Sequence, residues 1–162
     1  RRHYLSDRDA DAVVSRKFKI SDVELWQIIT SVDVLTAASQ YTVTWVIAKL
    51  SKGRTDIGSV NHCMHGKGTM HMTIVDWHPF TYFTGHCIDG NERFYQMYEI
   101  EPLPDENASI LHVRWRSDRS LPRWMTRLVG KVMVKKMNQS FCQQIEDYIQ
   151  KLQQPTFQPE AE

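Results

Sequence analysis

Residues 109–117 read SILHVRWRS, and residues 122–152 read PRWMTRLVGKVMVKKMNQSFCQQIEDYIQKL. In the first segment Leu111, Val113 and Trp115 alternate with polar residues, the period of two of a half-buried strand in an antiparallel sheet. In the second segment apolar residues recur at helical spacing, and Pro122 suits the first turn of a helix. A strand followed by a long terminal helix predicts an α+β fold in which the helix packs on one face of the sheet.

The terminal helix carries apolar residues on two sides. Advancing by about 100° per residue gives one stripe, which consists of Trp124, Met125, Leu128, Val129 and Val132. A second stripe lies nearly opposite and consists of Met133, Met137, Phe141, Ile145, Tyr148, Ile149 and Leu152. One straight helix cannot lay both stripes on one sheet, so we predict a kink, a break or a change of packing partner near Gly130.

The upstream sequence predicts the rest of the sheet. Residues 11–20 and 41–48 have strand patterns, the second with Tyr41, Val43, Trp45 and Ile47 on one face. Further strands are expected at about 57–65, 69–77, 80–88 and 93–101, separated by turn signals such as Asp89-Gly90. Between the first two strands, Ser21 and Glu24 form a potential capping box for a helix that runs to about residue 38.

Length and composition indicate one globular domain. The chain has 162 residues, of which 41% are hydrophobic and 24% charged, which argues against disorder, a collagen-like fibre or a coiled coil. No apolar run approaches the roughly 20 residues that span a bilayer. Cys63, Cys87 and Cys142 form no CxxC motif, and this odd number of cysteines favours a reducing, cytoplasmic setting. We expect the domain to cover 11–153.

Both ends of the chain are expected to be flexible. Residues 1–10 are polar, and residues 154–162 contain two prolines and little to bury. The first residue is Arg1 and not Met, so we expect a fragment, a processed product or a trimmed chain.

The charges are segregated along the chain. The net charge is +1, which argues against a dedicated nucleic-acid binder. Residues 114–136, however, hold eight basic residues and one acid (+7), and the remainder holds twelve basic and eighteen acidic residues (−6). A basic patch recurs every four residues, at Arg123, Arg127, Lys131 and Lys135. It is either a solvated helix face or a contact for an anionic membrane, an acidic partner or a ligand carboxylate.

Three local stretches add a family resemblance to this element order. They are Val23-Glu24-Leu25-Trp26, the segment from Gly58 to Gly66 (GSVNHCMHG), and the segment from Ile74 to Phe83 (IVDWHPFTYF). With them, residues 11–153 resemble the START-like, Bet v 1-like superfamily that includes polyketide cyclase/dehydrase-type domains. Similar domains also occur fused to bacterial class III adenylate/guanylate cyclases.

The resemblance implies a helix-grip fold. A curved antiparallel sheet of about six or seven strands, with a short helix after the first strand, would wrap around the long C-terminal helix. A hydrophobic cavity would lie between sheet and helix. The residues whose pattern places them on its walls are Trp45, Phe94, Gln96, Tyr98, Val113, Trp115, Met133, Met137 and Phe141. Aromatic rings and methionines form adaptable apolar walls, and the amide of Gln96 would orient a ligand. From the residues alone, a filled core fits the same pattern.

Catalytic and metal sites have weaker support. Asp76, Tyr98 and His112 are the available acid or base groups, but Asp76 with His78 equally suits a structural bend before Pro79. His65 and His71 would meet across a turn as two ligands, fewer than the four of a structural zinc site. We therefore predict no metal and no cofactor.

Three functions remain from the sequence. The preferred hypothesis is a regulatory or sensory module of a larger protein that binds a small hydrophobic or amphipathic ligand and signals to a fused or associated output domain. The first alternative is a polyketide aromatase/cyclase or dehydrase-type enzyme. The second is a protein- or membrane-interaction module that uses the basic helix.

Overall fold

The computed structural model describes residues 3–40, 42–65, 68–118 and 122–153. In chain order the elements are β1 (Ala12–Phe18), α1 (Asp22–Thr30), α2 (Val32–Ala38), β2 (Val43–Lys49), β3 (Val60–His65), β4 (Gly68–His78), β5 (Tyr82–Asp89), β6 (Glu92–Leu103), the 3-10 turn η1 (Pro104–Glu106), β7 (Ala108–Ser117), α3 (Arg123–Val129), the π-helical turn η2 (Gly130–Val134) and α4 (Lys135–Gln153). Tyr41 and residues 154–162, which the sequence placed on a strand and in a flexible tail, lie outside the described residues.

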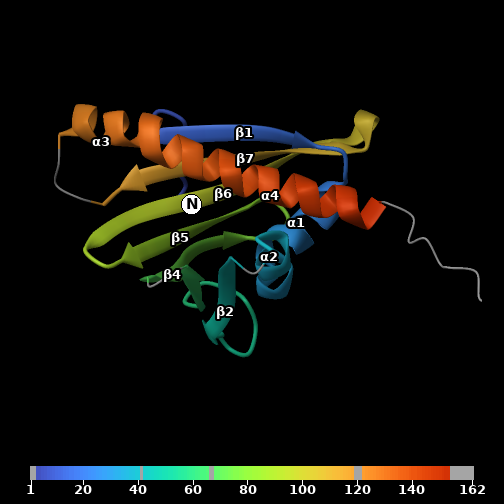
Figure 1. Cartoon of the computed structure of the whole chain (residues 1–162), viewed down its shortest axis with the longest axis horizontal. Coiled ribbons are helices and arrows are strands. Elements are labelled where there is room, and N and C mark those ends of the chain that lie inside the picture. The colour runs from blue at the N-terminus through green and yellow to red at the C-terminus, as the bar shows by residue number, and fades with distance from the viewer. Residues whose placement is uncertain (1–2, 41, 66–67, 119–121, 154–162) are drawn as a thin grey trace, which may run out of the picture.

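The strands form one antiparallel sheet of seven, in the order β1-β7-β6-β5-β4-β3-β2. All neighbours except β1 and β7 are also neighbours in the sequence, so short turns build the sheet and the pair β1–β7 joins the first strand to the last. The long C-terminal helix crosses the sheet (Figure 1). The predicted helix-grip α+β fold is confirmed.

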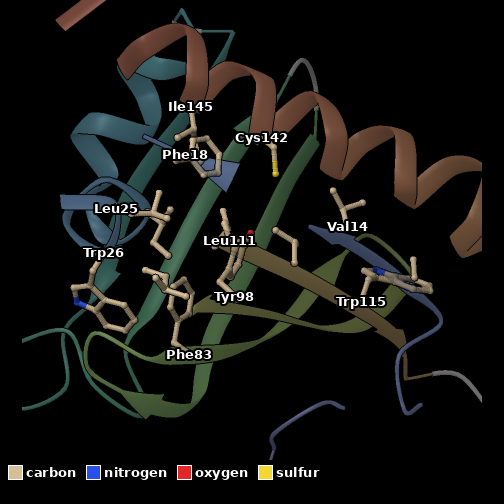
Figure 2. Close-up of a cluster of buried hydrophobic side chains, with 14 of the residues drawn as sticks. Val14, Phe18, Leu25, Trp26, Phe83, Tyr98, Leu111, Trp115, Cys142 and Ile145 are labelled. Atoms are coloured by element: carbon tan, nitrogen blue, oxygen red, sulfur yellow. The ribbon is translucent and has the colours of Figure 1, made fainter. Parts of the chain in front are cut away.

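The core lies between the inner face of the sheet and the helices. Leu111, Val113 and Trp115 point inward from β7, as their alternation predicts. Cys142 and Ile145 of α4 meet Val14, Phe18 and Leu111 from the opposite side (Figure 2). Burial of these apolar side chains is the main stabilising contribution to the fold.

The predicted single helix up to residue 38 is two helices. The capping box of Ser21 and Glu24 is present at the start of α1. Ser31 ends α1 in an extended conformation, and its hydroxyl accepts a hydrogen bond from the backbone N–H of Val34 as the N-cap of α2. The prediction overlooked that a serine inside an apolar run can start a new helix.

The terminal helix changes its hydrogen-bonding pattern at the predicted position. Residues Gly130–Val134 form a π-helical turn between α3 and α4. A Cβ on Gly130 would lie 2.8 Å from the carbonyl oxygen of Asp11 and 3.2 Å from Cβ of Ala12. Glycine therefore lets the helix approach the start of β1 closely.

The N-terminal segment covers part of the outer face, in contrast to the loose segment that its polarity suggested. Leu5 is 2% exposed and packs with Tyr82 and Met97. The backbone N–H of His3 donates to Asp76 at 3.2 Å, and its carbonyl accepts from Thr84 at 3.0 Å.

Among the described residues, no helix is long and apolar enough to cross a membrane.

Candidate functional site

A small void lies on the inner face of the sheet, between the α1–α2 pair and the helix α4. Its volume is about 10 Å³, roughly the space of one water molecule. The lining residues are Ile29, Thr30, Val32, Leu35, Trp45, Thr55, Asn61, Met72, Ile74, Trp77, Phe83, Tyr98 and Phe141. Side chains therefore fill most of the space in which the resemblance implied an open cavity, and the remaining void lies closer to α1 and α2 than expected.

A row of aromatic rings runs from α1 to α4, and its members Trp77, Phe83, Tyr98 and Phe141 line the void. Ring centroids are 4.9 Å apart for Trp26 and Trp77, 5.6 Å for Trp77 and Phe83, and 4.8 Å for Phe83 and Tyr98. Tyr98 then contacts Phe141 of α4 at 5.6 Å. Figure 2 shows Trp26, Phe83 and Tyr98 along this row. The row gives a continuous apolar surface from α1 to the C-terminal helix.

A bulge in β4 places Trp77 in this row. The register with β5 shifts between Ile74, which pairs with Gly85, and Asp76, which pairs with Thr84. An extra residue on one strand reverses the alternation of faces beyond it. Trp77 therefore points to the inner face, whereas Asp76 and His78 point to the outer face.

An open cleft borders the void. Its volume is about 420 Å³, and its walls are Arg54, Thr55, Asp56, Trp77 and Pro79. Thr55 and Trp77 line both spaces, so they form the partition between the cleft and the interior. Five of the described residues line the cleft, so it leaves an occupant largely exposed and suits an entrance better than a complete binding site.

A polar network lies beneath the C-terminal helix. Gln96 Nε2 donates to the hydroxyl of Tyr98 at 2.7 Å and to Asn138 Oδ1 at 3.5 Å. Burial raises the pKa of Tyr98 well above its usual range, so the phenol is neutral at physiological pH. Asn138 is buried, and its Nδ2 donor has no hydrogen-bond partner among the described residues. The inner face thus carries an amide donor available to a ligand acceptor.

The predicted ligand-binding residues divide into three groups. Trp45, Tyr98 and Phe141 line the void. Four more, namely Phe94, Gln96, Val113 and Trp115, are buried on the inner face but do not line it. The third group consists of Met133 and Met137. Their expected inward orientation is wrong, because Met133 is 69% exposed and Met137 is 51% exposed.

The error at Met133 and Met137 has a physical cause. Val134 and Asn138 occupy the sheet-facing positions of this part of the helix. The sequence argument assumed that the most apolar stripe is buried, whereas here small and polar residues face the sheet and permit close approach.

The catalytic candidates are not brought together. Tyr98 lies on the inner face and Asp76 on the outer face, where Asp76 accepts from the hydroxyl of Tyr82 at 3.3 Å. His112 is also on the outer face, between Ser15 at 2.8 Å and Glu101 at 3.0 Å. A sheet cannot present Tyr98 together with Asp76 or His112 to one substrate when the groups lie on its opposite faces.

The basic patch lies on the outer side of the helix. Arg123 and Arg127 donate to the backbone carbonyl of Arg8 at 2.8 and 3.2 Å. Lys131 and Lys135 are exposed and form no ion pair within the part of the chain that the structure describes. Two of the four basic residues thus hold the N-terminal segment by hydrogen bonds, and the other two are free to contact an anionic partner.

The histidine pairing differs from the expectation. His71 lies opposite His62, with ring centroids 4.2 Å apart, and His65 pairs with Gly68. Across the described ranges, no group of three or more His, Cys, Asp or Glu side chains is arranged to hold a metal ion.

The three cysteines are buried and free. Burial raises the pKa of the Cys63 thiol to about 12 and that of Cys142 to about 11, and it raises the pKa of Cys87 further. All three are neutral thiols near pH 7, and a neutral thiol is a poor nucleophile.

Sequence reasoning missed several lining residues. Met72 and Ile74 alternate with polar residues in β4, and this period was a usable signal. The contributions of Asn61, Thr55 and Trp77 depend on strand register and on the bulge, which the sequence pattern did not reveal.

Comparisons with known proteins identify the fold. No model of a known protein family matches the sequence, and no curated protein matches it. Solved structures do match, among them a START superfamily protein from Mycobacterium smegmatis, with a TM-score of 0.64, 13% identity, and coverage of 86% of this chain and 98% of that one. The chain has a START-like, Bet v 1-like fold.

Two further structures support the same fold. A protein from Mesorhizobium loti aligns with a TM-score of 0.69 and 13% identity, over 88% of this chain and 98% of the other. An HSP90 activator from Plasmodium falciparum aligns with a TM-score of 0.63 and 12% identity, over 85% and 94%. At these identities the START-like likeness concerns the fold alone.

Proposed function

We propose that this chain binds a small apolar or amphipathic molecule between the inner face of its sheet and the helices α1, α2 and α4. The observation that carries the proposal is the shared wall of Thr55 and Trp77 between the open cleft and the small void. A ligand enters at the cleft, displaces Trp77 and occupies the space along the aromatic row.

The chemistry of the lining supports an apolar ligand with few polar groups. Ligand sites for small molecules are mostly apolar with a few placed polar groups, and usually enclose about 300–1,000 Å³. The void of about 10 Å³ is far below this range. Binding therefore requires the interior to open, and the loop 50–59 and the side chain of Trp77 are the parts nearest the entrance.

The regulatory part of the proposal follows from Phe141. This residue belongs to α4 and lines the void, so a ligand that enlarges the void displaces α4 relative to the sheet. A fused or associated output domain would sense that displacement. The aromatase/cyclase alternative loses its candidate set, because Asp76 and His112 lie on the face away from Tyr98.

The test is a thermal-shift screen of the whole chain against fatty acids of ten to sixteen carbons and naphthalene derivatives. At a ligand concentration of 100 times Kd, binding stabilises a protein by about 2.7 kcal/mol. For a domain of this size that corresponds to a rise in Tm of roughly 5–10 °C.

A pair of variants assigns the binding to the void. Val32→Phe adds bulk to the lining, whereas Val23→Phe makes the same change at an exposed position of α1. We expect Val32→Phe to weaken binding at least tenfold and Val23→Phe to leave it unchanged. A screen without any stabilising compound, or an equal response of both variants, contradicts the proposed function.

A further inference from the structure

The outward face of α3 and η2 is an exposed apolar surface. Trp124 is 68% exposed, Leu128 58% and Val132 65%. Met125 and Val129 belong to the same helix stripe and are 39% and 49% exposed. We call these five residues the apolar helix face. In Figure 1 α3 lies at one end of the molecule, at the start of the long helix.

The way the helix contacts the sheet explains why this face remains exposed. From α3 to the first turn of α4, its buried residues are Thr126, Gly130, Val134 and Asn138, one every four residues. In a regular α-helix this spacing drifts by about 40° per step, because one turn takes 3.6 residues. The π-helical turn has i→i+5 hydrogen bonds and a wider turn, which offsets the drift. Small and polar residues therefore stay against the sheet, and the large apolar ones remain outside.

Basic residues flank the apolar helix face. Residues 122–140 contain five basic residues and no acidic residue. Lys131, Lys135 and Lys136 are exposed and form no ion pair with the described parts of the chain. Elsewhere the chain is net acidic, so the molecule has an uneven field with its positive side at this helix.

We propose that the apolar helix face docks on an anionic lipid membrane, parallel to its surface. An interfacial helix of this kind has large apolar side chains on one side and lysine or arginine beside them, and it binds in the plane of the headgroups. Trp124 is suited to the boundary between headgroups and acyl chains. The lysines contact anionic headgroups while their alkyl stems follow the apolar side chains. This inference goes beyond the proposed ligand binding and does not depend on it.

Charge favours a membrane over a second copy of this chain. Two copies packed through the apolar helix face would bring Lys131, Lys135 and Lys136 of each against those of the other, and like charges at an interface are unfavourable. The surface is also the outside of a helix, and Trp124, Leu128 and Val132 are each more than half exposed, so a flat bilayer can reach these side chains.

The experiment is co-sedimentation of the whole chain with vesicles of 30% phosphatidylserine in phosphatidylcholine, and with pure phosphatidylcholine as reference. We expect binding to the anionic vesicles that weakens as salt is raised, because lysine contacts to anionic lipids are screened. Leu128→Gln/Val132→Gln should reduce the partition coefficient at least tenfold, and Lys131→Gln/Lys135→Gln by a similar factor, since each basic residue contributes roughly fivefold.

Matched controls lie elsewhere on the surface. Leu152→Gln changes a leucine that is 65% exposed at the far end of α4. Lys49→Gln/Lys151→Gln removes two exposed lysines, one in β2 and one at the far end of α4. Both controls should bind vesicles as the parent chain does, and circular dichroism should show all variants folded.

Three outcomes overturn the proposal. The first is no binding to anionic vesicles, and the second is an equal loss in the control variants. The third is an absence of vesicle binding together with another interaction that depends on Leu128 and Val132. Oligomers seen by sedimentation would assign the face to self-association, and binding of polyglutamate would assign it to an acidic protein. A failed ligand screen leaves this test unaffected, because the vesicle assay does not involve the void.

Discussion

The two halves of the C-terminal helix use their apolar residues in opposite ways. In α4 beyond residue 140, Cys142, Ile145 and Ile149 are buried against the sheet. In α3 and η2 the buried positions are Thr126, Gly130 and Val134, and most of the large apolar side chains face outward. The C-terminal half is anchored by the hydrophobic effect, and the N-terminal half by close backbone approach and by hydrogen bonds from Arg123 and Arg127.

The comparison shows that an apolar stripe on a helix identifies a surface that has to be covered, but does not identify the partner. In the C-terminal half the sheet covers it. In the N-terminal half the sheet-facing side is set by what fits against Asp11 and Ala12, and only a glycine fits there.

The largest effect is expected from substitutions that test the difference in burial. Ile145→Ala removes a fully buried side chain and should lower the free energy of unfolding by about 2–5 kcal/mol. Val132→Ala, on the exposed face, should change it by at most about 0.5 kcal/mol. Urea denaturation measures both, and similar costs at the two sites would show that the N-terminal half is also packed.

A smaller effect is expected at the boundary between the halves. Gly130→Ala places a Cβ at 2.8 Å from the carbonyl oxygen of Asp11, a backbone atom that cannot move aside easily. We expect a loss of about 1–3 kcal/mol, as for other overpacked sites.

In an unobstructed helix the Gly130→Ala change would instead stabilise by up to about 1 kcal/mol. A measured gain in the urea midpoint would therefore contradict close approach as the anchor of the N-terminal half. Val129→Ala, at the neighbouring exposed position, is the control and should be nearly neutral.

A third test sharpens the comparison through pH. In the folded chain burial raises the pKa of Cys142 to about 11, whereas an unfolded thiol titrates near about 8.5. At a pH below the pKa of the unfolded chain, the thiol is protonated in both the folded and the unfolded state. At a pH between the two pKa values only the unfolded state loses the proton, so rising pH favours unfolding by up to about 1.4 kcal/mol per pH unit.

Chemical denaturation at pH 8, 9, 10 and 11 measures this slope. Cys142→Ala should flatten it relative to the parent chain, although Cys63, Cys87 and Tyr98 continue to contribute in the same direction. An unchanged slope would mean that Cys142 is accessible to water and that the C-terminal half is less tightly packed than its burial indicates.

The elements were largely predictable, because alternation in β7 and helical spacing after Pro122 are local properties. The split at Ser31 was missed, since the capping preference of a single serine competes with a continuous apolar pattern. For the site, Tyr98 and Phe141 could be placed near the void, but Trp77 could not, because a bulge of one residue changes the face of every residue beyond it.

The sequence by itself determined the order of strands and helices, the capping box at Ser21 and the change in the helix at Gly130, because these depend on residues close together in the chain. The tertiary structure alone decided which helix stripe is buried, on which face Asp76 lies, and how little space remains beside Tyr98. Each of these depends on contacts between residues far apart in the chain, such as Gly130 with Asp11 and Trp77 with Trp26, whose packing a one-dimensional pattern does not record.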